Sequence, residues 1–183
     1  AEAAGQIRVT VIHYDPAILA KFPHIFGGMI VANEIKNRPT PDSLKARFFE
    51  EQETVRERVG NHSLAEIPAL SAWRSSFRAF GSDPTKYRCA AESLTRRLVK
   101  KGDIPSINML VDMGNLVSIR YSLPLSVMDL RHVQGAITVR FADGNQHYRE
   151  LNSDEVIYPE AGEVVFSDET GMIMARRWCW RQS

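Results

Sequence analysis

Apolar residues that alternate with polar ones predict a strand near the start of the chain. Residues 7–15 follow this pattern, which is typical of a half-buried strand. Residues 26–35 then bring two adjacent glycines followed by apolar side chains. We expect a tight turn there, leading into a second buried segment.

Helical spacing of apolar residues dominates the middle of the chain. We expect helices over residues 40–60, 63–80 and 83–102. Thr40, Ser63 and Asp83 each precede a helical pattern and are the expected N-caps. Gly60 and Gly102 follow the last periodic residues and are the expected stops.

The alternating pattern returns in the last third of the chain. Residues 135–151 predict a β-hairpin with its turn at Asp143–Gly144. Residues 162–178 predict a second hairpin, folded about Thr170–Gly171. The order of elements favours a mixed α/β (α+β) fold, with helices packed on an antiparallel or mixed sheet. We expect residues 1–183 to form a single domain.

One further helix, expected over residues 106–123 and ended by Pro124, carries an unusual surface. Beside its apolar face runs a stripe of short polar side chains, namely Asn108, Asp112, Asn115, Ser118 and Ser122. Asn and Ser are poor helix formers, so a plain exposed surface gains little from them. They either bond to neighbouring backbone or face a ligand. Gly114 costs roughly 1 kcal/mol relative to alanine, which indicates close packing or close approach of a ligand.

Charge is balanced overall but unevenly distributed. The formal net charge of +1 argues against a polycation that wraps nucleic acid, and we expect no DNA partner. Cations nevertheless gather in residues 74–101, and residues 150–169 carry acidic side chains without a cation. This distribution permits a basic face for a phosphate-rich ligand. A codon bias toward arginine would give the same composition.

Several classes of protein are disfavoured by the sequence. No apolar run approaches the ~20 residues of a membrane span, and the first residues do not form a signal peptide. Cys89 and Cys179 are too few for a disulfide scaffold, so a cytoplasmic setting is the simplest interpretation. No histidine pair with helical i,i+4 spacing and no glycine-rich phosphate loop occurs. We expect neither a metal nor another cofactor.

Three motifs in order resemble the editing domain of the bacterial phenylalanyl-tRNA synthetase beta chain, and more closely its freestanding relatives. The first is "WRSSFRAFGSDPTKYRCAAESLTRRLVKKGDIPSIN", which is similar to the signature of the freestanding proteins. The second is "VDMGNLVSIRYSLPLSVMDL", similar to the Asp-x-x-Asn helix, proline and closing Asp of the family. The third is "VQGAITVRFADG", similar to its glycine-led strand. The resemblance covers about residues 73–183, and residues 1–70 match only loosely.

The resemblance implies a pocket that accepts the aminoacylated 3′ end of tRNA and hydrolyses the ester of a wrongly charged amino acid. The tRNA end and the amino-acid moiety are then the expected ligands. By position, Asp112 and Asn115 match the helix motif, Asp129 closes the loop, and Gly135 heads the strand. The family places a histidine where this chain has Ser126.

We expect Asn115, Ser118, Ser126 and Gly135 to line the pocket, with Asn115, Ser126 and Asp129 as catalytic candidates. Arg78, Arg88 and Arg177 are the expected supporting or phosphate-facing cations. Two other interpretations stay open. One is a non-catalytic module that binds tRNA or an amino acid. The other is an enzyme that holds a small carboxylate with Arg176 and Arg177.

Overall fold

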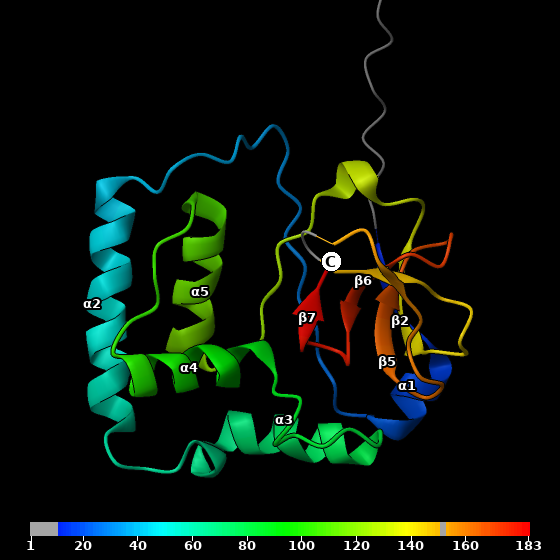
Figure 1. Ribbon diagram of the computed structural model, residues 1–183, viewed down its shortest axis with the longest axis horizontal. Helices are drawn as coiled ribbons and strands as arrows, with labels where there is room; N and C mark the ends of the chain where they lie inside the picture. Colours follow the sequence, from blue (N-terminus) through cyan, green and yellow to red (C-terminus); the bar gives the residue numbers. More distant parts are fainter. Residues whose placement is uncertain (1–10, 151–152) are drawn as a thin grey trace, which may run out of the picture.

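The computed structural model describes residues 11–150 and 153–183 of the chain. It has a mixed α+β fold, as predicted (Figure 1). The elements in chain order are β1 (Ile12–Tyr14), α1 (Pro16–Lys21), α2 (Asp42–Val59), the 3₁₀ turn η1 (Leu64–Glu66), α3 (Pro68–Ala79), α4 (Ala90–Lys101), α5 (Met109–Tyr121), η2 (Leu130–His132), β2 (Ile137–Phe141), β3 (Tyr148–Arg149), β4 (Val156–Ile157), β5 (Val164–Ser167), β6 (Ile173–Arg176) and β7 (Arg181–Gln182). No helix in these described ranges is both long and apolar enough to cross a bilayer.

The main sheet is mixed and has the strand order β1-β2-β5-β6-β7. Strand β1 runs parallel to β2, with Ile12 opposite Ile137, and β2 runs antiparallel to β5. The predicted strand over residues 7–15 is therefore present in its second half, while residues 7–10 lie outside the described part. The hairpin about Thr170–Gly171 is confirmed, because β5 and β6 pair across it.

The hairpin predicted over residues 135–151 is wrong. The chain does turn after β2, but β3 pairs with β4 in a separate two-stranded sheet. Both edges of β2 are already occupied, one by β1 and the other by β5. The backbone groups of β2 are therefore already hydrogen-bonded on both sides, and β3 pairs with β4 instead.

The three helices predicted in the middle of the chain are confirmed, and the first and third end at Gly60 and Gly102 as expected. Their starts differ. Ser63 caps the 3₁₀ turn η1, and α3 begins later, at Pro68. Thr40 does not cap α2, because its hydroxyl donates instead to Asp112 at 2.5 Å.

The third helix also starts late. The carboxylate of Asp83 accepts from the amide of Thr85 at 2.8 Å and closes a turn, and α4 begins only at Ala90. In this segment the predicted cap residue, Asp83, therefore stabilises a separate turn that precedes the helix. Asx-type bonds serve both structures equally well, so the sequence signal does not separate them.

The two larger hydrophobic cores define a sheet lobe and a helical lobe (Figure 1), and a smaller third cluster around Tyr148 and Ile173 lies in the sheet lobe. In the sheet lobe, Val139 and Val164 pack against α1 and α3. In the helical lobe, α2, α4 and α5 bury Phe48, Leu98, Leu116 and Ile119, among others. Leu64 and Ile67 pack against both cores, so the segment that leads into α3 joins the lobes.

An inter-lobe strap, residues 22–41, connects α1 to α2 without regular secondary structure (Figure 1). The prediction of a buried segment at residues 26–35 is wrong, because Phe26 and Ile30 are 92% and 95% exposed. The strap crosses from one lobe to the other and pairs with no strand of the sheet. Gly27 passes so close to Tyr14 that a Cβ would lie 2.3 Å from the phenol oxygen. The glycine therefore lets the backbone of the strap contact the Tyr14 side chain.

Candidate functional site

The start of α5 uses two members of the polar stripe to hold the fold. The side chain of Asn108 accepts from the amide of Val111 at 3.1 Å and caps the helix. Asp112 is fully buried, and its carboxylate accepts from the hydroxyls of Thr40 and Ser106 and from the amide of Ile107. Burial raises the pKa of Asp112, but these hydrogen bonds outweigh it and leave the pKa below its usual value.

The end of α5 uses two more members of the stripe. The buried hydroxyl of Ser118 donates to the carbonyl of Leu123 at 2.7 Å. Ser122 ends the helix in the left-handed region, at φ 53°. Asn115 differs from them. It is half-buried, and within the described ranges its side chain makes no hydrogen bond to the protein.

The linker of residues 123–128 folds back against α5 beside Asn115. A Cβ on Gly114 would lie 2.9 Å from Leu125 Cδ2 and 3.7 Å from Val127 Cγ2. Of the two explanations for this glycine, close packing is therefore the one observed. Ser126 lies between these two apolar residues in the chain and is exposed to solvent. The serine that replaces the expected histidine is thus accessible on the linker between the lobes.

Asp129 follows this linker and caps the turn η2. Its carboxylate accepts from the amide of Arg131 at 3.0 Å and pairs with the guanidinium, with Nε 2.9 Å away. The hydrogen bonds from Arg131 hold the pKa of Asp129 well below its usual range. Asp129 is therefore an ionised acceptor at neutral pH.

Gly135 lies at the entrance of the sheet lobe, with a positive φ of 73°. A Cβ there would lie 2.1 Å from the carboxyl carbon of Glu169, and a Glu169 oxygen accepts from the amide of Ala136 at 3.2 Å. Only glycine combines this backbone conformation with so close a carboxylate. The glycine predicted from the family motif is thus a special backbone position in the structure.

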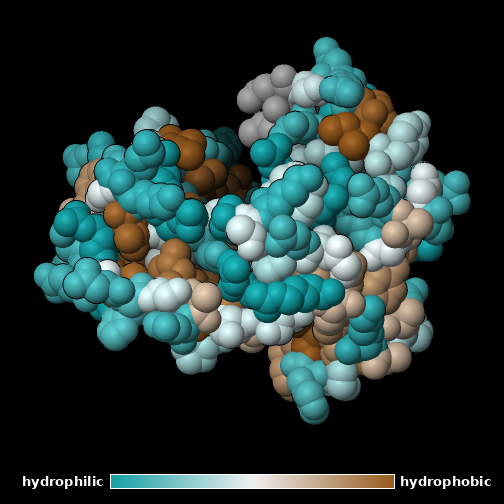
Figure 2. All heavy atoms as spheres, turned by 60° about the horizontal axis from the view of Figure 1, so that its bottom comes forward, coloured by the Kyte–Doolittle hydropathy of each residue, from teal (hydrophilic) through white to brown (hydrophobic). Residues whose placement is uncertain are grey.

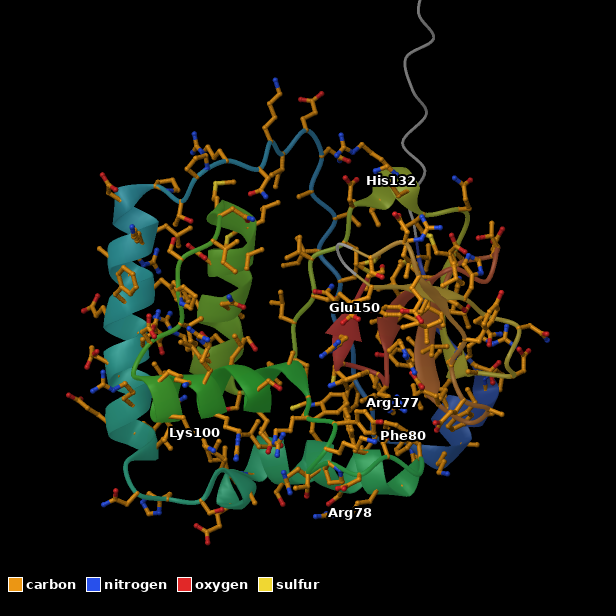
Figure 3. The ribbon with its side chains drawn as sticks, in the orientation of Figure 1. Arg78, Phe80, Lys100, His132, Glu150 and Arg177 are labelled. Atoms are coloured by element: carbon orange, nitrogen blue, oxygen red, sulfur yellow. The ribbon has the colours of Figure 1, made fainter. Side chains whose placement is uncertain are left out.

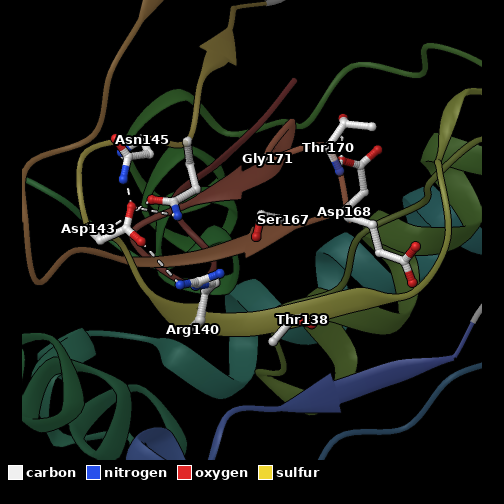
Figure 4. Close-up of a pocket in the computed structure, with 10 residues that line it drawn as sticks. Thr138, Arg140, Asp143, Asn145, Ser167, Asp168, Thr170 and Gly171 are labelled. Carbon is white, nitrogen blue, oxygen red and sulfur yellow. Dashed lines mark hydrogen bonds and ion pairs between the residues drawn. The ribbon is translucent and has the colours of Figure 1, made fainter.

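A polar cavity of about 460 Å³ lies next to Gly135 on the sheet (Figure 4). Thr138 and Arg140 of β2 form its floor, and the 143–146 loop and the 167–171 turn form its walls. Two carboxylates of the cavity, those of Asp143 and Asp168, accept several hydrogen bonds from the protein and so stabilise the fold. Asp143 accepts from Arg140 and from two groups of its own loop. Asp168 accepts from four groups, including the amide of Gln134 at 3.0 Å.

The cavity has hydrogen-bonding groups but no obvious catalytic cluster. Bonds from Thr170, Gln134 and Met172 outweigh the burial of Asp168, so its pKa lies below the usual value. No group of three potential metal ligands occurs in the ranges 11–150 and 153–183. The arrangement can orient a polar ligand.

The predicted cations occupy three different environments. Arg177 is buried, with its guanidinium 3.0 Å from Glu163 and stacked over the ring of Tyr87 at 3.8 Å. Arg88 is half-buried, with Nε 3.7 Å from Glu92. Arg78 is exposed on the outer side of α3 (Figure 3).

Arg176 also binds Glu163, through two contacts of 2.8 Å, and these bonds raise the pKa of Arg176. The carboxylate that Arg176 and Arg177 hold is therefore an internal one, and Arg177 does not face a phosphate at the surface. Nothing in this geometry supports the alternative interpretation in which Arg176 and Arg177 clamp a small carboxylate ligand. Trp178 packs in the sheet-lobe core, edge-on to Trp73 at 5.4 Å.

The structure also shows how part of the basic run noted in residues 74–101 is arranged on the surface, although of its groove-lining residues only Arg88 was a site candidate. Ser93, Arg96, Arg97 and Lys100 lie on one face of α4, where a groove of about 320 Å³ runs along the helix. The signal that would have found them is their 3-, 4- and 7-residue spacing within the basic run. Hydrophilic residues cover most of the α3–α4 side of the molecule, with separate apolar patches among them (Figure 2).

Comparisons with known proteins agree with the motifs. The family model described as the B3/4 domain matches residues 72–183. A phenylalanine–tRNA ligase beta subunit of Shewanella oneidensis is 29% identical over 77 residues, which are 42% of this chain and 10% of that protein. The corresponding subunit of Cutibacterium acnes is 33% identical over 81 residues, 44% of this chain and 9% of that protein. The chain thus spans about a tenth of the curated relatives it matches. No solved structure shows significant similarity to it.

Proposed function

Because the chain belongs to the B3/4 domain family, we propose that it binds the aminoacylated 3′ end of tRNA and hydrolyses mischarged aminoacyl-tRNA in trans. The observation that carries the proposal is the family match over residues 72–183, which contains Asn115, Ser126, Asp129 and Gly135. Both curated relatives are phenylalanine–tRNA ligase beta subunits. A separate editing step suits such chemistry, since one binding site discriminates close analogues by only about 1–3 kcal/mol.

The chemistry asks little of the protein, because an aminoacyl ester is already activated. The site has to orient a water molecule, donate hydrogen bonds to the developing oxyanion and fit the amino-acid side chain. In our proposal the amide of Asn115 is an oxyanion donor, and Ser126 positions the water or the free ribose hydroxyl. Asp129 accepts a hydrogen bond from that water. The low pKa of Asp129 suits an acceptor and not a general acid.

The test is deacylation of a panel of mischarged tRNAs, measured by release of labelled amino acid above the spontaneous rate. We expect Asn115→Ala to lower kcat by about 100-fold, the usual effect of removing one oxyanion donor. Asn61→Ala is the matched control, because Asn61 is exposed in the turn after α2. No release above background for any member of the panel would exclude the enzyme.

A non-catalytic binding module is the second candidate, and Ser126 is the observation that favours it. The resembled editing domains have a histidine at this position, and a hydroxyl is a far weaker general base at neutral pH. This candidate predicts saturable binding of uncharged tRNA or of an amino acid, with thermal stabilisation of the protein. The ligand would be recovered unchanged. Ser126→His should not hydrolyse aminoacyl-tRNA, and hydrolysis by this variant would contradict the non-catalytic candidate.

A further inference from the structure

The groove on α4 is a strongly basic surface of the helical lobe. It is lined by Arg88, Ser93, Arg96, Arg97, Lys100 and Lys101. The opposite face of α4 is buried through Ala91, Thr95 and Leu98. The helix is therefore amphipathic in an unusual way, with an outward face made of cations and one small serine. In Figure 3 Lys100 points away from the body of the lobe.

In the part of the chain that the structure describes, internal ion pairs engage only two of the five cations. Arg88 lies 3.7 Å from the buried Glu92. The carboxylate of Asp103 lies 3.9 Å from Arg97, but both side chains are exposed. Within the described ranges Arg96, Lys100 and Lys101 have no ion-pair partner. The helix dipole favours cations in the last turn, which accounts for Lys100 and Lys101. It does not account for Arg96 and Arg97, which lie one turn earlier.

The chemistry of the groove suits a phosphate backbone. A rise of 1.5 Å per residue separates Arg96 from Lys100 by about 6 Å along the helix, so consecutive phosphates can each meet a cation. Arginine presents a planar fork that fits phosphate oxygens. No aromatic residue lines the groove among the described residues. A protein partner would be expected to use such an anchor.

We propose that the α4 groove binds the phosphate backbone of the tRNA body, separately from the site that receives the 3′ end. The inference rests on the proposed function for its choice of tRNA. It assigns a division of labour to the two lobes. Electrostatic contacts along α4 supply affinity without regard to sequence, and the linker and the sheet lobe receive the terminal nucleotide.

The first experiment measures binding of labelled, unfractionated tRNA to the full chain as a function of salt. The test variant is Arg96→Gln with Lys100→Gln, and the matched control is Lys36→Gln with Arg47→Gln, two exposed cations outside the groove. We expect the test variant to bind about tenfold more weakly and to reduce the slope of log K against log salt by 1.4–1.8, roughly 0.7–0.9 per cation. The control should match the wild type. Circular dichroism verifies that both variants are folded.

Two results would overturn the inference. One is an unchanged affinity and salt slope in the Arg96–Lys100 variant. The other is equally strong, equally variant-sensitive binding of polyglutamate, which would assign the groove to an acidic protein instead.

Hydrolysis of an aminoacylated CCA fragment separates this inference from the proposed function. If the groove is a docking surface, the test variant deacylates the fragment like the wild type but loses activity on full tRNA. If the wild type hydrolyses nothing yet binds tRNA through α4, the proposed deacylase fails and the groove assignment stands.

Discussion

Asp112 shows how a residue of a functional motif can have its main role in the fold. The carboxylate ties the start of α5 to Thr40 at the end of the strap and to Ser106 in the preceding loop. Residue types alone could not distinguish this role from a ligand contact, because both need a short polar side chain on the same helix. The distinguishing information is burial and partner position, which depend on distant parts of the chain.

Asp112→Ala should destabilise the protein by about 2–3 kcal/mol at pH 7, because two hydroxyls and one amide lose their acceptor. The folded-state pKa of Asp112 lies below the value in the unfolded chain. Its contribution is therefore present above the unfolded pKa of about 3.9 and is lost as the pH falls through the folded pKa. Urea titrations from pH 7 to pH 3 should show the difference between wild type and variant shrinking. Asp112→Asn, which retains one acceptor, is the control and should cost less.

Gly135 was selected from the family motif as a pocket residue, and in the structure it has a backbone conformation that favours glycine. Gly135→Ala should cost about 1–2 kcal/mol, because alanine is strained at positive φ and its Cβ meets Glu169. Glu169→Ala in the same chain should recover part of this cost by removing the crowding carboxylate. Denaturant unfolding of both single variants and the double variant measures the coupling. Strictly additive effects would contradict the contact.

At the scale of elements, helices were more predictable than strand pairing. Apolar periodicity located α2, α3, α4 and α5, and glycine stops marked the ends of α2 and α4, because these signals act within a single helix. The parallel pairing of β1 with β2 joins residues more than a hundred positions apart, and local pattern carries no information about it. The wrong prediction of a buried segment at residues 26–35 of the strap has a similar reason. Hydrophobic composition predicts burial only where another element is available to cover it.

The end of α5 offers a test of whether Ser122 belongs to the fold or to a ligand site. Ser122→Gly should stabilise the protein by about 1 kcal/mol, because glycine has no penalty in the left-handed conformation. Ser122→Ala keeps the backbone strain and removes only the hydroxyl. Thermal unfolding and tRNA binding should be measured for both. Both substitutions remove the hydroxyl, so a loss of binding in both variants would assign it to the ligand, and unchanged binding in both would assign Ser122 to the fold.

At the scale of the whole molecule, Glu163 connects three parts of the chain. It binds Arg176 at the end of β6 and Arg177 in the following turn, and Arg177 in turn stacks on Tyr87 before α4. A feature assigned to ligand binding from sequence thus fastens the sheet lobe to the segment that leads into the helical lobe. The sequence showed the excess of acidic residues and the arginine pair, but not which acid is buried.

Glu163→Ala should destabilise the protein by about 3–5 kcal/mol, because the buried guanidinium of Arg176 loses its counter-charge and that of Arg177 keeps only an exposed one. Glu160→Ala is the matched control. Glu160 also approaches Arg177, at 3.8 Å, but it is exposed and should contribute less than about 1 kcal/mol. Urea unfolding compares the two. Equal effects would mean that the buried pair is not the stronger one.

The inter-lobe strap should also allow a protease to cut the chain into two pieces. Its exposed Phe26 in irregular backbone is a favourable site for chymotrypsin, and limited digestion should cut there early. The released N-terminal piece would contain β1 and α1, whose Asp15 amide bonds to the Val139 carbonyl at 2.9 Å and whose Ile18 is buried in the sheet-lobe core. We therefore expect two fragments on a denaturing gel but a single species in gel filtration. Such a nicked protein would be a natural complementation pair, in which a short strand–helix peptide reassembles with the rest of the fold.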